Sequence, residues 1–229
     1  MEFLSMFANK VDDGYGGFIY VPTTAGYAAL VAIILLLLIG AGAIYGYRNK
    51  GRVDIRQMAV TSLLIALAFA ASNVKLWRMP MGGSVTLFSM RFICLIGYWY
   101  GLGAGMMGGL AYGLLQMAID PYVISLPQLL VDYVLAFTAL GLSGLGCGKK
   151  HGLVLGYVAG VLGRLCFAVL SGLIFFAAYT PENMSPFIYS LGYNGAYLAA
   201  EGAMTAVLLL VPQVRAGLDY GKRLAVRGH

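Results

Sequence analysis

The sequence predicts an all-α integral membrane protein with about seven membrane-spanning helices, the first standing apart from the other six. Three observations support this fold class. Hydrophobic residues make up 60% of the 229 residues and charged residues only 10%, whereas soluble domains carry about 25% charged residues. Long uncharged segments recur along the chain, and Lys and Arg gather between alternate segments. None of the segments alternates polar and apolar residues as the strands of a membrane barrel do.

The first helix is expected at residues 24–47. No charged residue occurs between Ala25 and Gly46, and about 20 apolar residues suffice to cross the hydrocarbon core. Basic residues follow this stretch, whereas the basic region of a signal peptide precedes its apolar region. We therefore interpret it as a retained anchor, followed by a basic linker at residues 48–54.

Six further apolar segments make residues 55–212 a membrane domain, and a basic tail follows at residues 213–229. The predicted helices are Ile55 to Asn73, Thr86 to Tyr100, Gly103 to Ile119, Gln128 to Gly146, Leu153 to Tyr179 and Pro186 to Val211.

The orientation follows from the distribution of basic residues. If the chain crosses at every segment, one side collects ten of them and the other side only three, which are Lys10, Lys75 and Arg78. Because basic loops stay in the cytoplasm, the sequence predicts an extracellular N-terminal segment (residues 1–23) and a cytoplasmic C-terminus in a cell membrane, which the family resemblance described below implies is bacterial. The net charge of +6 then reflects topology and anionic lipid, so no nucleic-acid partner is expected.

The sequence lacks the motifs that are typical of several functional classes of protein. The three cysteines form no CxxC pair and no metal-ligand spacing, so we expect no metal and no cofactor. There is no Walker A pattern, GxSxG elbow or HExxH motif. We therefore predict a protein that is not an enzyme and does not hydrolyse ATP itself.

Polar residues at membrane depth are the candidate site, because ionisable groups there usually face a cavity or a partner. Arg91, Arg164 and Glu201 could equally pair across helices as structural contacts. Asp132 is distinct, because it follows Leu126-Pro127-Gln128 closely and so lies near the outer end of its helix. With Tyr133 beside it, a carboxylate here suits a small cation that donates hydrogen bonds.

The last predicted helix supplies further candidates. Tyr189 and Asn194 are about 140° apart around a helix and can border one groove, although Tyr189 could also belong to an interfacial tyrosine belt. Gly192 and Gly195 beside them would let a ligand or a neighbouring backbone approach.

Three sequence blocks carry a family resemblance: PMGGSVTLFSM, DPYVISLPQLLVDYVLAF and AYTPENMSPFIYSLGYN. In their order and membrane sides they resemble the ThiT family, the thiamine-binding S components of energy-coupling factor (ECF) transporters. The resemblance covers about residues 55–212 and implies a six-helix S-component bundle that binds thiamine from outside. It also implies two kinds of partner, a transmembrane scaffold subunit and two ATPase subunits.

The resemblance also implies site residues. Asp132 with Tyr133, and Tyr189 with Asn194, match the family's acid-aromatic and Tyr/Asn positions; the carboxylate and amide would hydrogen-bond the aminopyrimidine. The outer loop from Met81 to Thr86, with the lid residues Gly82, Gly83 and Ser84, would cover the site, and the two glycines would act as its hinge.

One departure concerns the ligand. At two positions where the family carries His and Trp, this chain has Ala168 and Phe176. Two alternatives for the ligand are therefore open: thiamine bound less tightly than in the family, or a related vitamin or thiamine precursor. Arg164 would repel a cation, so we expect it to be neutralised, with Glu201 as the candidate partner.

Small residues on the first bundle helix, Ala66 and Ala70, resemble the surface through which S components meet the scaffold subunit, although ordinary packing is an alternative. A secondary transporter is a further alternative, but its usual inverted repeats are not discernible. The role of the extra N-terminal helix is left open.

Overall fold

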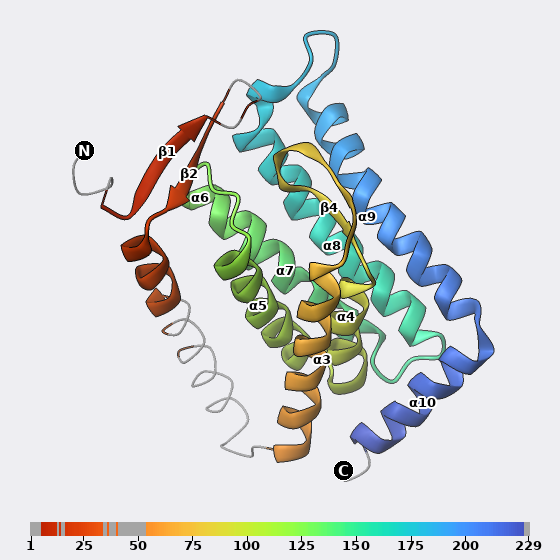
Figure 1. The fold of residues 1–229 in the computed structure, drawn as a ribbon. Coiled ribbons are helices and arrows are strands. Elements are labelled where there is room, and N and C mark those ends of the chain that lie inside the picture. Colours follow the sequence, from red (N-terminus) through yellow and green to blue (C-terminus); the bar gives the residue numbers. More distant parts are fainter. Residues whose placement is uncertain are drawn as a thin grey trace.

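The chain is described by a computed structural model over residues 6–12, 14, 17–33, 36, 40 and 54–226. Within these residues it is a helical bundle with two small antiparallel hairpins at one end (Figure 1). The strands are β1 (Ala8–Asp12), β2 (Phe18–Pro22), β3 (Lys75–Arg78) and β4 (Ser84–Thr86). The helices are α3 (Ile55–Asn73), η1 (Pro80–Gly82), α4 (Ser89–Tyr100), α5 (Leu102–Ile119), α6 (Leu126–Leu129), η2 (Leu130–Leu135), α7 (Ala136–Thr138), η3 (Ala139–Gly146), α8 (Gly152–Phe175), η4 (Ala177–Tyr179), α9 (Pro186–Leu210) and α10 (Pro212–Val226).

The predicted helical membrane fold is confirmed. Among the described residues, four helical segments are long and apolar enough to cross a membrane: Ile55–Asn73, Leu102–Ile119, Leu126–Gly146 and Gly152–Phe175. The pair α9 and α10 passes the same test together, with a bend of 89° between them. Helix α4 is shorter than expected, because the chain from Ser84 to Thr86 is a strand rather than the start of the helix.

Only part of the predicted extra helix lies within the described residues. An apolar helix spans Thr24–Ile33. The rest of that prediction, apart from residues 36 and 40, and the basic linker up to residue 53 fall outside the part of the chain that the structure describes.

Local sequence signals explain where the two outermost long helices of the bundle begin. Asp54 caps α3 by accepting hydrogen bonds from the backbone N–H groups of Arg56 and Gln57. Ser185 caps α9 in the same way through Ile188 N–H, and Pro186 occupies the first helical position. Both arrangements satisfy backbone donors that a helix leaves open at its N-terminus.

Helix α5 packs against the segment Leu126–Gly146 through a row of glycines spaced four residues apart. A Cβ atom at Gly113 would lie 2.0 Å from the carbonyl oxygen of Tyr133, and one at Gly109 would lie 2.4 Å from that of Phe137. Close backbone approach of this kind is how membrane helices gain packing contacts. The row continues at Gly105, so one face of α5 lies directly on the neighbouring backbone.

Helix α8 approaches the other side of the same segment equally closely. A Cβ atom at Gly156 would lie 2.4 Å from the carbonyl oxygen of Ser143, and one at Gly160 would lie 2.6 Å from that of Leu140. The segment Leu126–Gly146 is therefore held between two glycine faces. Along this length its backbone changes from α-helix to a π-helical turn (η2) and later to a 3₁₀ helix (η3), conformations that often mark local strain or a functional site.

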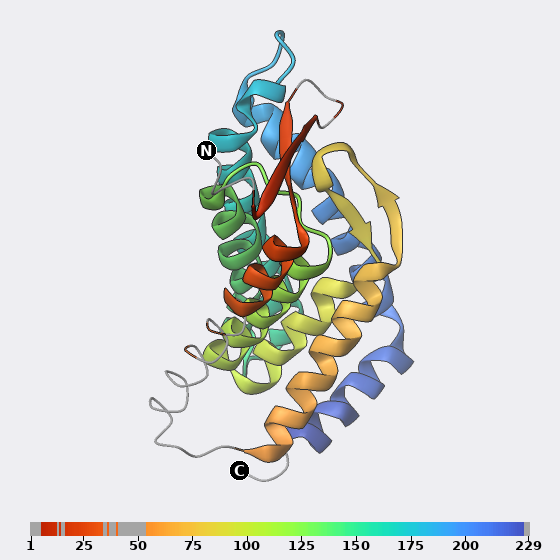
Figure 2. The same cartoon turned by 60° about the vertical axis from the view of Figure 1, so that its left-hand side comes forward.

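The predicted basic tail is a helix. α10 turns sharply from α9 and crosses the end of the bundle opposite the hairpins, under α4 and beside the start of α3 (Figures 1 and 2). Tyr100 donates a hydrogen bond to the carbonyl oxygen of Ala225, and the Lys222 ammonium lies 3.9 Å from the Tyr98 ring centroid. α10 therefore closes this end, while the hairpin end carries the largest cluster of polar side chains described below.

Candidate binding cavity

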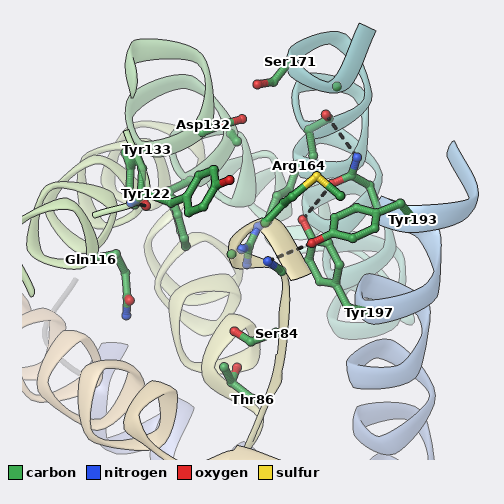
Figure 3. Close-up of a pocket in the computed structure, with 18 of the residues that line it drawn as sticks. Ser84, Thr86, Gln116, Tyr122, Asp132, Tyr133, Arg164, Ser171, Tyr193 and Tyr197 are labelled. Atoms are coloured by element: carbon green, nitrogen blue, oxygen red, sulfur yellow. Dashed lines mark hydrogen bonds between the residues drawn. The ribbon is translucent and has the colours of Figure 1, made fainter. Parts of the chain in front are cut away.

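The cavity lies at the hairpin end, between α5, the segment Leu126–Gly146, α8 and α9, and residues of the hairpin β3–β4 contribute to its lining (Figure 3). It encloses about 160 Å³, which suits a small molecule rather than a peptide. All six residues predicted to bind the ligand line it, as do the three predicted lid residues. These nine residues are Asp132, Tyr133, Tyr189, Asn194, Phe176, Ala168, Gly82, Gly83 and Ser84.

The π-helical turn η2 carries the candidate acid. Gln128, one turn earlier and 1% exposed, donates from Nε2 to Asp132 Oδ2 at 2.6 Å. The same amide donates to the carbonyl oxygen of Tyr122, and its Oε1 accepts from Ile124 N–H. Gln128 therefore fixes one carboxylate oxygen of Asp132 and joins it to the loop at the cavity mouth, residues 120–125, which we call the mouth loop.

Tyr133 lies on the same wall and also contacts the mouth loop. Its hydroxyl accepts a hydrogen bond from Tyr122 N–H at 2.8 Å and donates to the carbonyl oxygen of Asp120 at 3.1 Å. Its ring stacks on that of Phe137, with centroids 6.3 Å apart. Asp132 and Tyr133 are adjacent in sequence, yet both reach the cavity.

Asn194 faces the cavity from α9 and is largely engaged within the protein. Its Nδ2 donates to the carbonyl oxygens of Ala168 and Ser190, at 3.3 and 3.0 Å. Its Oδ1 accepts from the Tyr197 hydroxyl at 3.0 Å. Because an amide oxygen has two lone pairs, what this side chain can still offer a ligand is one acceptor site.

Three tyrosines on α9 form an aromatic row along the cavity. Tyr189, Tyr193 and Tyr197 are spaced four residues apart, so they share a helix face. Their ring centroids are 6.3 Å apart for the first pair and 6.1 Å for the second. The sequence analysis singled out Tyr189 alone, although the regular spacing was a signal for all three.

The glycines beside this row do not mediate close approach. Among the described residues, a Cβ atom at Gly192 or Gly195 would meet no atom within 4 Å, so no neighbouring helix backbone approaches them, and the approach of a ligand stays a prediction. The close contact is instead made by Gly172 of α8, where a Cβ atom would lie 2.0 Å from the Ser190 hydroxyl.

Helix α8 contributes the positions at which this chain departs from the family pattern. Ala168 is 8% exposed and accepts the Asn194 hydrogen bond through its backbone. Phe176 stacks on Tyr122, with ring centroids 6.0 Å apart. Between them, Ser171 is 1% exposed, and its hydroxyl faces Asp132 but makes no hydrogen bond of standard geometry within the described residues.

The expected ion pair between Arg164 and Glu201 is not formed, although both residues line the cavity. The Arg164 guanidinium lies 4.2 Å from the Phe137 ring centroid and points into the cavity (Figure 3). Glu201 is 2% exposed, and its carboxylate accepts hydrogen bonds from both the backbone and the hydroxyl of Thr86, and from Met90 N–H at 2.9 Å. The prediction of this pair was wrong because backbone and hydroxyl donors at the start of α4 satisfy Glu201, a contact between distant segments.

The predicted lid loop is the hairpin β3–β4, and it is tied down on two sides. The Tyr193 hydroxyl of α9 accepts from Gly83 N–H at 3.0 Å and donates to the carbonyl oxygen of Pro80. On the other side, Lys75 of β3 forms an ion pair with Asp120 of the mouth loop. A Cβ atom at position 83 would lie 2.6 Å from the Tyr193 hydroxyl, so a larger residue there would displace the Tyr193 side chain from the hairpin.

Ala66 and Ala70 lie away from the cavity, on the exposed face of α3. Ala68 on the opposite face is fully buried in the bundle core. The alternative interpretation, in which Ala66 and Ala70 pack inside the bundle, therefore does not apply to these two residues.

The cavity's formal charge is slightly negative. Two basic residues, Lys75 and Arg164, and three carboxylates, Asp120, Asp132 and Glu201, line it. The excess is one negative charge, and the cavity otherwise presents aromatic rings and hydroxyl groups. An electron-rich, partly enclosed site of this kind favours a small cation with flat rings.

Comparisons with known proteins agree with this architecture. The family model described as thiamine transporter protein (Thia_YuaJ) matches residues 58–218. The thiamine transporter ThiT of Bacillus subtilis (strain 168) is 32% identical over 176 residues, which cover 71% of this chain and 91% of that protein. A solved structure of ThiT from Listeria monocytogenes superposes with a TM-score of 0.56 at 21% identity, covering 69% of this chain and 96% of the other. The chain is thus a multi-pass membrane protein that belongs to the thiamine transporter family Thia_YuaJ.

Proposed function

We propose that this chain is the substrate-capturing S component of an ECF-type importer and that it binds thiamine in the cavity described above. The observation that carries the proposal is that Asp132, Asn194 and the aromatic row of α9 line one cavity in a member of the thiamine transporter family.

The hydrogen-bonding groups suit an aminopyrimidine. Asp132 keeps Oδ2 on Gln128 and offers Oδ1 as an acceptor. Asn194 offers its remaining lone pair on Oδ1. Two acceptors match the exocyclic amine of the pyrimidine, because that group carries two N–H donors.

The cationic thiazolium is accommodated by aromatic rings rather than by a direct ion pair. Tyr122 and Phe176 stack at the mouth, and the faces of such rings attract cations. The charge of Arg164 is partly offset by the Phe137 ring over which it lies and by the two carboxylates of Asp132 and Glu201.

The partners follow from the family and from the chain's own surface. An S component uses a separate scaffold subunit and two ATPase subunits, in keeping with the absence of a Walker A pattern. Ala66 and Ala70, exposed on α3, would permit close approach of a scaffold helix. By the positive-inside rule the cavity end faces the outside and α10 the cytoplasm.

Mass spectrometry of small molecules released from the purified full chain tests the ligand directly. We expect thiamine. If only the pyrimidine precursor is recovered, the precursor rather than thiamine is the ligand. If neither compound is recovered and titration calorimetry detects no heat of thiamine binding, the proposal is overturned. Uptake of labelled thiamine by cells expressing the chain without the energising subunits would instead identify an autonomous transporter.

A further inference from the structure

We propose that the N-terminal hairpin β1–β2 is a positioning element of the binding cavity, which holds the mouth loop in place and thereby slows ligand escape. This inference rests on the proposed function, because it concerns the same cavity. The family match begins at residue 58, so the hairpin lies outside the part of the chain that the family model describes.

The hairpin is bonded to the mouth loop through one backbone contact. Tyr20 N–H donates to the carbonyl oxygen of Val123 at 2.6 Å. Tyr20 pairs with Lys10 in the hairpin, and because its N–H points to the mouth loop, it is not one of the donors of the β1–β2 ladder. Two residues further along, Pro22 has no N–H at all. This edge of β2 is thus free to bond the loop without loss to the hairpin.

The mouth loop is the point at which several cavity walls meet. Tyr122, next to Val123, donates through its N–H to the Tyr133 hydroxyl and accepts through its carbonyl from Gln128, which holds Asp132. Its side chain lies against the lid, where a Cβ atom at Gly82 would be 3.2 Å from that of Tyr122. A displacement of the mouth loop would therefore disturb the positions of Asp132, the Tyr133 ring and the lid.

A second cavity shows that the hairpin stands beside the binding cavity. This open cavity has a volume of about 330 Å³ and is lined by Lys10, Phe18 and Tyr20 of the hairpin, Ile124 of the mouth loop, and residues at the end of α8 and in η4, including Tyr179. Phe176 touches both Tyr122 and Tyr179, at centroid distances of 6.0 and 5.9 Å. The aromatic group of Tyr122, Phe176 and Tyr179 therefore contributes lining residues to both cavities.

Two substitutions at one position isolate the backbone bond. Tyr20→Pro removes the N–H donor and the ring, whereas Tyr20→Ala removes the ring and keeps the donor; Pro is tolerated on a strand edge whose N–H lies outside the ladder. We expect thiamine to dissociate about fivefold faster from Tyr20→Pro than from Tyr20→Ala, the scale of one lost hydrogen bond, with little change in association rate. Equal dissociation rates in the two variants would overturn the proposal.

A measurement on the unmodified chain covers the case in which Tyr20→Pro does not fold. Coupling between two sites is reciprocal, so thiamine should slow deuterium exchange of the Tyr20 amide as well as that of the mouth loop. Exchange at Tyr20 that is unchanged by saturating thiamine, while the mouth loop becomes protected, would overturn the role of the hairpin and leave the proposed function standing. Absence of any thiamine binding would instead contradict the proposed function.

Discussion

Two walls of the same cavity are built on different physical principles. α9 is a regular helix whose tyrosines at 189, 193 and 197 line the cavity, and a Cβ atom at Gly195 would meet no atom of the described residues within 4 Å. The opposite wall, the segment Leu126–Gly146, changes helix type twice and is pressed between the glycines of α5 and α8. One wall follows from local periodicity, while the other depends on close contact with two distant helices.

This difference predicts where the cavity is sensitive to substitution. A change on the open side of α9, where Gly192 and Gly195 lie, should affect the contacts of the altered side chain alone, because that side has space for it. A change at the clamped wall should move the backbone that carries Asp132 and Tyr133, because no space is available.

The largest effect is expected for Gly113→Ala. Its Cβ atom would lie 2.0 Å from the Tyr133 carbonyl oxygen, so we expect the unfolding free energy to fall by about 2–3 kcal/mol. The melting temperature, measured by the change in protein fluorescence on heating, should fall accordingly. Gly195→Ala is the matched control, with open space for the methyl group and a gain of about 0.5–1 kcal/mol. Equal melting temperatures for the two variants would contradict the comparison of the walls.

Asp132→Asn tests the chemistry of the clamped wall without changing its shape. Loss of the charge should weaken thiamine binding by about 1–3 kcal/mol, measured by titration calorimetry. Asp219→Asn, on the exposed surface of α10 at the opposite end, should bind as the unmodified protein does. An unchanged affinity in Asp132→Asn would remove Asp132 from the site.

Tyr193→Phe tests the regular wall. It keeps the ring in the aromatic row but removes both hydrogen bonds to the hairpin β3–β4, so thiamine should dissociate several-fold faster, a cost of about 1 kcal/mol, in stopped-flow measurements. Tyr157→Phe removes a buried hydroxyl that donates to Thr205, away from the cavity, and should lower stability without changing the dissociation rate. If both variants release thiamine at the rate of the unmodified protein, Tyr193 does not hold the lid.

The smallest effect is expected on α8, which contacts both walls. The Ser171 hydroxyl is buried and makes no hydrogen bond of standard geometry within the described residues, so Ser171→Ala should leave the ligand-free protein equally stable or more stable by up to about 1 kcal/mol. Ser190→Ala removes a hydroxyl that donates to the Val169 carbonyl oxygen at 3.0 Å and should destabilise by about 1 kcal/mol. Thermal melts that rank the two variants in the opposite order would show that Ser171 is satisfied in the folded protein.

Much of the helical fold, and many of the residues that line the cavity, were predictable from the sequence. Apolar length located the spanning helices within a few residues, and Asp132, Tyr133, Tyr189 and Asn194 were selected because polar groups are rare at membrane depth. The hairpin β3–β4 was not predicted, because its strands are short and carry no turn signal beyond a glycine pair. Helix α10 was missed because its composition resembles that of a charged tail.

The sequence by itself determined that this protein lies in a lipid bilayer, how many apolar segments it has and which residue types are available for a cavity. It could do so because hydropathy and charge act on each segment independently of the others. Only the tertiary structure decided which groups satisfy one another. Glu201 bonds Thr86 rather than Arg164, Tyr193 bonds the lid, and the clamped wall adopts a π-helical turn. These pairings join residues far apart in the chain, so they depend on how closely the helices approach, which glycine contacts between distant segments establish.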